Sequence, residues 1–469
     1  MSDWLYNMSR TDALEFEYEA LFGVKRLRDD FWSLQDLEND PRWKDHPVKG
    51  RASFMDKAIV INFHGDGAQF HDNDSLMTVS FSGALKEGST LDTNLLLASW
   101  PKYHCASHEG GTWDTLWAWI VWDINQLYAN TYQHSDPWGG PLPAHLQERA
   151  GQAILPDDYF VVVNAVCSDL DFAQVDLGLP NKGCVDPNPC CGYCHGNKTD
   201  NNWFNFQEDA PWKTSAPRDP YTTHVIAKIV GLTVWHFMID VLHTGDHGVA
   251  SHAVANVLHD TIFQKLRHES RGRAVQIVAE HLMANAPEHG SALTHFELKM
   301  FINPKKLYAE YPLIAQLKAA QVRGMIPAVA ELAEKYSTGS REDRHRVRMM
   351  NSLATVYEIM HNSGIAIPRA EYDRMKKAAD VFLLTYNWLS ENARHNNVVM
   401  FNVVPKFHYF FHMIQQARFT NPRFVWTYGG DPPPISADKL MMWGPLPPVL
   451  IPDQLISGLV KQYHTFRST

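Results

Sequence analysis

The sequence predicts an α/β protein in which a mixed β-sheet is interrupted by a large all-α insertion. Strand-like runs and one amphipathic helix occupy residues 57–166, helical patterns dominate 221–395, and a short strand with a further helix follows at 398–417. The 469 residues are 45% hydrophobic and include 15 Trp, enough apolar material for a large core. We divide the chain into an N-terminal helical segment (1–54), the first part of the core (55–215), the insertion (216–396) and the remainder of the core with a proline-rich tail (397–469).

The β-rich part has a defined order of elements. β-branched or alternating apolar runs predict three strands at 57–63, 76–83 and 93–99, joined by turn-forming residues. Apolar residues at helical spacing predict an amphipathic helix over 111–131, and an apolar run at 158–166 predicts a buried fourth strand. Three strands, a helix and a fourth strand parallel to the first form the opening of an RNase H-like fold.

The insertion consists of helical patterns that share no repeat period. These patterns predict helices at 221–243, 248–267, 271–286, 306–336, 340–362 and 369–394.

Charge and targeting signals narrow the function classes. The net charge of −10 argues against a generally basic nucleic-acid binder and leaves only local basic patches for that role. The N-terminus lacks the basic and apolar regions of a secretory signal, and no apolar run approaches the roughly 18 residues of a membrane span. We therefore expect an intracellular protein without a membrane partner.

Two aspartates follow predicted strands that should be neighbours. Asp66 lies in HGDG after the first strand, and Asp169 lies in CSDLDF after the fourth. Two converging carboxylates at one sheet edge can hold divalent metal ions about 3.5–4 Å apart, the arrangement that drives in-line phosphoryl transfer. Asp171 could replace Asp169. Aspartate is also common in turns, so a purely structural role is the alternative.

A second set of residues has the spacing of a zinc site. Four of the six cysteines fall between Cys184 and Cys194, and in a reducing compartment such a cluster is more typical of metal binding than of disulfides. Cys191 and Cys194 form a C-x2-C pair, and His408 and His412 would lie one helical turn apart on the same face. We predict a Cys2His2 zinc site, with Cys190 as an alternative first ligand. The competing interpretation is reduced buried thiols and core histidines.

A third motif, Asp240-x2-His243, places a carboxylate and an imidazole on one helical turn. It is also the pattern of a capping or salt-bridging pair at a helix end.

The order of these motifs resembles the DDE/DDD cut-and-paste transposases. It is most similar to the groups whose RNase H-like core binds zinc and carries a helical insertion, such as the CACTA and Transib/V(D)J-recombinase-like families. The resemblance spans roughly residues 55–431 and rests on order and spacing. It implies DNA strand cleavage and strand transfer by two Mg2+ or Mn2+ ions on Asp66 and Asp169, with structural Zn2+ on the Cys2His2 set. Asp240 and His243 would shape the site or its DNA contacts. The family also implies a nuclear location and a homo-oligomer.

The third acid of this family is usually a glutamate on a helix. Here Asp431 stands nineteen residues past His412, and three prolines follow it in WTYGGDPPPIS. Proline is incompatible with a helix interior. Asp431 either acts as a ligand from a loop, or the final helix is lost and the chain is a decayed or domesticated relic. Such a relic would be a zinc-stabilised module that binds DNA or protein.

DNA contact requires basic groups. In the helix predicted at 340–362, Arg341, Arg344 and Arg348 fall on one face and could meet phosphates. The alternative is a solvated face studded with ion pairs.

Overall fold

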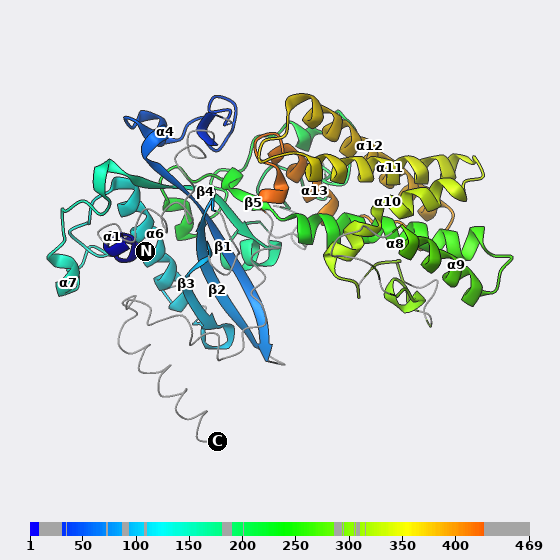
Figure 1. Ribbon diagram of the computed structural model, residues 1–469, viewed down its shortest axis with the longest axis horizontal. Coiled ribbons are helices and arrows are strands. Elements are labelled where there is room, and N and C mark those ends of the chain that lie inside the picture. The colour runs from blue at the N-terminus through cyan, green and yellow to red at the C-terminus, as the bar shows by residue number, and fades with distance from the viewer. Residues whose placement is uncertain are drawn as a thin grey trace, which may run out of the picture.

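The computed structural model is a mixed α/β protein built on one five-stranded mixed sheet (Figure 1). The sheet and its flanking helices form one part of the molecule, and the helices from α8 to α13 form the other. The structure describes residues 1–8, 31–33, 35–71, 74–86, 93–106, 110–180, 190–199, 201–285, 293, 295–303, 305, 310–314 and 316–425.

The sheet has the strand order β3-β2-β1-β4-β5. Its strands are β1 (Ala58–His71), β2 (Asp74–Gly83), β3 (Leu95–Pro101), β4 (Phe160–Ser168) and β5 (Phe237–Ile239). The first three strands pair antiparallel, whereas β4 pairs parallel with β1 and β5 pairs parallel with β4. The predicted three strands, helix and parallel fourth strand are therefore confirmed, with bounds within about two residues except at the end of β1, which runs to His71 where the prediction ended at 63.

Different segments cover the two faces of the sheet. On one face, Trp117 and Ile124 of α6 (Thr112–Ala129) pack on Phe63 and Val166 in a buried apolar cluster. On the other face, Trp32 and Trp43 from the N-terminal segment pack on alternate β-strand residues such as Val60 and Val162. The alternation of side chains along a strand separates these two sets. The N-terminal segment, to which the sequence assigned no chemistry, therefore covers the sheet.

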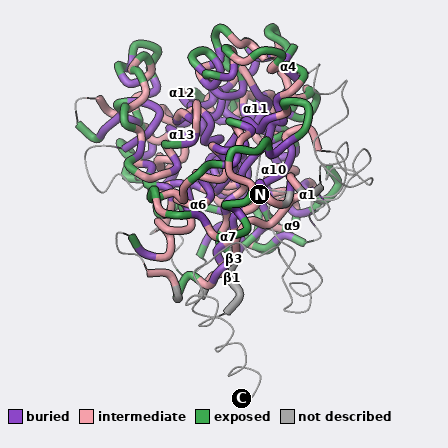
Figure 2. The backbone as a smooth tube through the Cα atoms, turned by 90° about the vertical axis from the view of Figure 1, so that its left-hand side faces the viewer, coloured by how far each residue is buried: buried purple, intermediate pink, exposed green. Residues whose placement is uncertain are grey.

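The helices have the following bounds: α1 (Ser2–Met8), α4 (Phe54–Lys57), α6 (Thr112–Ala129), α7 (Ala144–Gln147), α8 (Ser251–Asp260), α9 (Arg271–Ala284), α10 (Ala319–Lys335), α11 (Arg341–Asn362), α12 (Arg369–His395) and α13 (Pro405–Gln416). Figure 2 shows buried residues along the interior of the molecule and exposed residues on its outer loops. Helices α8 to α13 share a second apolar core, which also includes the segment around Cys191. The proposed domain boundaries remain predictions.

The helix predicted at 221–243 is wrong. Irregular chain with two short 3-10 turns, Val225–Lys228 and Val234–His236, occupies most of this segment, and the edge strand β5 lies near its end. The side chain of His224 caps the first turn by accepting the N–H of Ile226, and Gly231 adopts a positive φ of 77° that breaks any helical run. An apolar run of this length can be helix or strand, and here tertiary pairing with β4 decides for a strand.

Two further boundaries differ from prediction. The helix expected at 306–336 begins only at Ala319, because Lys318 has extended backbone angles and acts as the N-cap. The short strand expected near 398 is irregular chain, in which Asn397 and Phe401 have positive φ. Its backbone groups hydrogen-bond to side chains and not to a neighbouring strand. The Phe401 N–H donates to Asn256 Oδ1, and the Tyr386 hydroxyl donates to the Asn402 carbonyl. Within the described ranges, no helix is both long and apolar enough to cross a bilayer.

Candidate functional site

Three aspartates follow residues that lie side by side in neighbouring parallel strands. Gly65 of β1 pairs with Ser168 of β4, and Ser168 pairs with Ile239 of β5. The next residues along the three strands are Asp66, Asp169 and Asp240. The carboxyl ends of parallel strands meet at one edge of a sheet. The structure therefore brings the first two predicted acids to one edge and adds Asp240 to them.

Asp66 lies within a strand, which differs from the turn position predicted for it. β1 continues to His71 because it stays paired with β2, and Asp66 is opposite Thr78 in that ladder. It is the first residue past the last pairing of β1 with β4. Its Oδ1 accepts the N–H of Gly67 at 2.7 Å, and the residue is partly exposed. This placement leaves the acid at a fixed position on a rigid element.

Asp169 is the first residue after β4, as predicted. Its Oδ1 accepts the N–H of Phe172 at 2.6 Å, which starts the following helical turn. Asp171, the alternative, is exposed and lies one residue before the π-helical turn Phe172–Asp176. Sequence reasoning missed Asp176: burial raises its pKa to about 6, Lys102 opposes this shift, and the charge of Asp169 adds to it. Asp176 is therefore a further carboxyl close to Asp169.

Asp240 and His243 form a hydrogen-bonded pair beside these acids. Asp240 is 1% exposed and caps the π-helical segment Val241–Ala250 by accepting the N–H groups of Leu242 and His243. Its Oδ2 is 2.7 Å from Nδ1 of His243. Burial opposes charging of this imidazole, but the Asp240 hydrogen bond and the charges of Asp240 and Asp169 raise the pKa of His243 overall. The predicted capping role is confirmed, and the same contacts place His243 within the field of Asp169.

The sheet face next to these acids is covered by the last described residue. Cys167 of β4, Met238 of β5 and Val425 form one small buried cluster. Asp431, the predicted third acid, lies outside the described residues.

The four predicted zinc ligands lie together. The metal-binding atoms of Cys191, Cys194, His408 and His412 are all within 4.8 Å of one another, and all four residues are buried. Nε2 of His408 is 3.2 Å from Sγ of Cys194 and 3.2 Å from Nε2 of His412. A tetrahedral ion with bonds of about 2.0–2.3 Å holds its ligand atoms roughly 3.3–3.8 Å apart. The cluster therefore could hold a metal ion, and it joins segments more than 200 residues apart.

Hydrogen bonds to neighbouring groups orient the two imidazoles toward the centre of the cluster. Nδ1 of His408 is 3.0 Å from the carbonyl oxygen of Trp203, and Nδ1 of His412 is 2.7 Å from Oε1 of Gln415. Both partners are acceptors, so each Nδ1 carries the proton and each Nε2 presents a lone pair. Two such lone pairs at 3.2 Å repel each other unless a cation lies between them. Nothing in the sequence pattern pointed to Trp203 or Gln415 in this role.

The electrostatics of the cluster favour ligand-competent forms. Burial lowers the pKa of His408, which keeps its imidazole neutral. A hydrogen bond from the Cys191 thiol lowers the pKa of Cys194, although burial opposes this shift. Cys190 is buried next to the cluster, but its carbonyl accepts from the Tyr409 hydroxyl and its thiol is not among the clustered atoms. The structure therefore favours Cys191 over Cys190. Cys184 lies outside the described residues.

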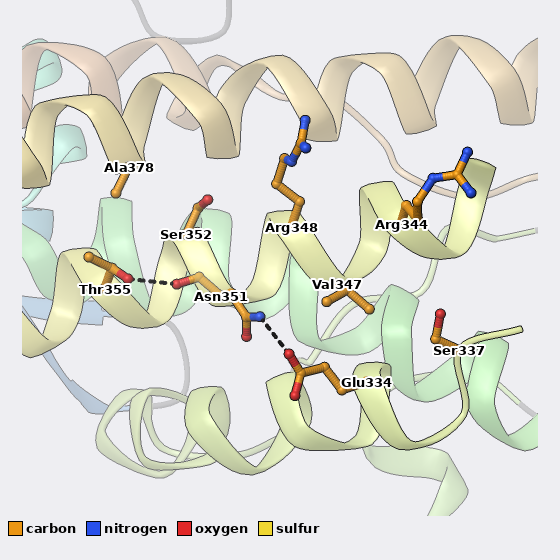
Figure 3. A pocket seen from close by; sticks show the side chains of 9 residues that line it. All are labelled: Glu334, Ser337, Arg344, Val347, Arg348, Asn351, Ser352, Thr355 and Ala378. Carbon is orange, nitrogen blue, oxygen red and sulfur yellow. Dashed lines mark hydrogen bonds between the residues drawn. The ribbon is translucent and has the colours of Figure 1, made fainter. Parts of the chain in front are cut away.

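The three predicted DNA-contacting arginines are exposed on α11. Arg344 and Arg348 line a groove of 520 Å³ between α10, α11 and α12, and Figure 3 shows both extending from the same side of α11, away from Glu334. Arg341 instead covers the ring of Trp388, with 4.9 Å between Cζ and the ring centroid. In the described part of the chain, no carboxylate forms an ion pair with Arg344 or Arg348. Both arginines are solvent-exposed, and their contact with DNA stays a prediction.

Comparison with known proteins adds no assignment. No protein-family model matches the chain, and no curated protein is significantly similar to it.

Proposed function

We propose that the chain is a transposase-derived protein with an RNase H-like core, whose sheet-edge aspartates hold divalent metal ions for DNA strand cleavage and strand transfer. The observation that carries this proposal is that Asp66 and Asp169 are the residues directly after Gly65 and Ser168, the last pair of the parallel strands β1 and β4. Carboxylate oxygens are the ligands that Mg2+ and Mn2+ prefer. The order of strands around β1 and the family resemblance of the motifs both agree with it.

The residues present divide the expected chemistry between them. Asp66 and Asp169 would hold the metal ions, which supply an activated oxygen nucleophile and stabilise the leaving oxygen. The imidazole of His243, fixed by Asp240 and charged more readily than usual, is suited to hold a phosphate oxygen at the same edge. The Cys2His2 donor set, with its neutral imidazoles and thiols, suits Zn2+. Zinc would act structurally, because all four positions are filled by protein.

A third metal ligand decides between the active and the decayed form. Asp240 already accepts hydrogen bonds from two backbone N–H groups and from His243, so it is poorly placed to complete a metal triad. Asp431 lies six residues beyond Val425, and six extended residues reach about 20 Å. We propose Asp431 as the third ligand. A relic that keeps the zinc scaffold and only binds DNA or protein is the second candidate. It is favoured because the hydrogen bonds of Asp240 leave this carboxylate poorly placed to replace a missing third ligand.

Calorimetric titration of Mn2+ into zinc-loaded protein tests the acidic site. We expect Asp66→Ala and Asp169→Ala each to weaken Mn2+ binding more than about tenfold, because each removes a ligand. Asp171→Ala is the matched control, since its exposed side chain lies two residues from Asp169 and should leave the affinity unchanged.

The variant Asp431→Ala then separates the two candidates. Lost binding in Asp431→Ala supports a complete triad and justifies a search for DNA strand transfer. Binding that needs Asp66 but ignores Asp431 supports the relic. If wild-type protein binds no Mn2+, or if the Asp66 and Asp169 variants bind it as tightly as wild type, the metal-dependent function is excluded.

DNA binding through the α11 groove gives a second test. Arg344 and Arg348 are uncompensated cations beside hydroxyl and amide side chains, a chemistry that suits phosphate oxygens. We expect Arg344→Ala with Arg348→Ala to weaken DNA binding and to reduce the salt slope of log K by about 2, one for each lost phosphate contact. Fluorescence anisotropy over a range of salt concentrations measures both quantities.

Arg369 is the control, because it is an exposed arginine that pairs with Asp373 on α12. Arg369→Ala should leave the slope unchanged. An equal slope for wild type and the double variant would remove the groove from the DNA interface. With DNA as its substrate, the protein would act in the nucleus, and we propose a homo-oligomer on the resemblance alone.

A further inference from the structure

A glutamine side chain hydrogen-bonds to both kinds of backbone group on the outer side of the edge strand β5. β5 pairs with β4 on one side only, which leaves the backbone groups on its other side to be satisfied elsewhere. Gln416, the last residue of α13, supplies both kinds of partner. Its Nε2 donates to the carbonyl of Phe237 at 2.9 Å, and its Oε1 accepts the N–H of Ile239 at 3.0 Å. The amide side chain thus takes the place of a sixth strand.

A second contact reaches the same strand from the C-x2-C loop. Tyr193 lies between Cys191 and Cys194, and its hydroxyl donates to the Phe237 carbonyl at 2.5 Å. Its ring packs against His412, with 5.4 Å between the ring centroids. Both halves of the Cys2His2 cluster are therefore joined to β5, one through Tyr193 and the other through α13. In Figure 1, α13 lies between β5 and the other helices.

The strand that these contacts hold ends at the acidic edge. Ile239 is the last residue of β5, and Asp240 follows it with its hydrogen bond to His243. Gln416 is 4% exposed, so no water competes for its amide. A shift of β5 would carry Asp240 and His243 with it.

We infer that Gln416 is a positioning residue that couples the Cys2His2 metal centre to the Asp240–His243 pair at the end of β5. Its neighbour Gln415 has a different task, because Gln415 orients His412 within the cluster. Of these two adjacent glutamines, Gln415 therefore contacts the metal-binding cluster and Gln416 contacts β5. The part of this inference that concerns divalent-metal binding rests on the proposed function, whereas the clamp on β5 does not.

The two glutamines give a matched pair of variants of similar volume, Gln416→Met and Gln415→Met. Three quantities are measured on each protein: Zn2+ affinity by competition with a chromophoric chelator, hydrogen exchange of the peptide containing Ile239, and Mn2+ affinity of the zinc-loaded form. For Gln416→Met we expect Zn2+ affinity within about twofold of wild type and exchange at Ile239 at least about tenfold faster. We also expect Mn2+ binding about tenfold weaker, because Ile239 pairs with Ser168, the residue before the proposed ligand Asp169. For Gln415→Met we expect Zn2+ affinity to fall about 10–100-fold. At saturating Zn2+, its exchange at Ile239 and its Mn2+ affinity should stay unchanged.

The results distinguish the coupling from a general loss of structure. Unchanged exchange at Ile239 in zinc-loaded Gln416→Met overturns the inference, as does an equal response of all three quantities in both variants. If wild type binds no Mn2+, the proposed function fails, and the exchange measurement still decides on the clamp. If Gln416→Met does not fold, Tyr193→Phe removes one hydrogen bond to the same carbonyl. It should accelerate exchange at β5 to a smaller extent, and no acceleration there also overturns the inference.

Discussion

Removal of the metal ion that we propose for the Cys2His2 cluster is expected to lower the free energy of unfolding by more than about 4 kcal/mol, the range in which loss of a bound metal falls. The cluster joins residues 191–194 to residues 408–412 in the interior, where all four ligands are at most 2% exposed. Without an ion, two imidazole lone pairs face each other at 3.2 Å beside the Cys194 sulfur. Such buried polar groups cannot be satisfied by water.

Denaturant unfolding with and without a strong chelator measures this loss, and a metal assay of the purified protein gives the stoichiometry. His412→Ala should match the chelated wild-type protein in stability and should respond little to further chelation. Cys190→Ala is the control, because Cys190 is equally buried and adjacent to Cys191 but outside the cluster. It should keep one bound ion. A metal-free protein as stable as the untreated one would show that the cluster is only a set of packed side chains.

The first half of the fold could be predicted from the sequence because its signals are local. Alternating or β-branched runs bounded by turn residues mark β1 to β4, and helical spacing of apolar residues marks α6. The clustering of the two cysteines and two histidines was also predictable, since C-x2-C and H-x3-H are the spacings at which side chains can reach one ion. Each of these patterns lies within a single strand, a single helix or one short motif.

The parts that escaped prediction depend on contacts between distant segments. β5 has three residues and exists because it pairs with β4 and is held by Gln416, which lies 177 residues beyond Ile239. Gln415 and the Trp203 carbonyl orient the two histidines only because of where α13 packs in the folded chain. Asp240 was predicted beside His243, but its place in line with Asp169 follows from β5 and not from the motif. Register between strands cannot be obtained from one sequence alone.

Loss of stability at mildly acid pH is the other large effect we expect. Two buried histidines, His46 and His236, and the half-buried His224 use Nδ1 to accept a backbone N–H at the start of a 3-10 turn. A ring in this role cannot be protonated without losing that hydrogen bond. Burial lowers the pKa of His46 and of His224 to about 4, and it lowers that of His236 well below the ordinary value.

The direction of the pH effect follows from the protons bound in each state. Above about pH 6.5 these histidines are neutral in both states and contribute nothing. Between about pH 6.5 and 4 the unfolded chain binds protons that the folded chain does not, so stability falls as the pH falls. A shift of the pKa from 6.5 to about 4 lowers the free energy of unfolding by up to roughly 3 kcal/mol for His46 and again for His224.

Urea unfolding at pH 7.5, 6 and 5 measures how the free energy of unfolding changes with pH. Any acid lability of the Cys2His2 cluster contributes equally to this slope in every variant. The difference between wild type and His46→Gln isolates one histidine, since glutamine keeps an acceptor but binds no proton. His46→Gln should therefore lose up to about 1.4 kcal/mol less per pH unit than wild type, whereas His268→Gln, at an exposed site, should follow wild type. Identical slopes for all three proteins would mean that these buried histidines are protonated as readily in the folded state as in the unfolded one.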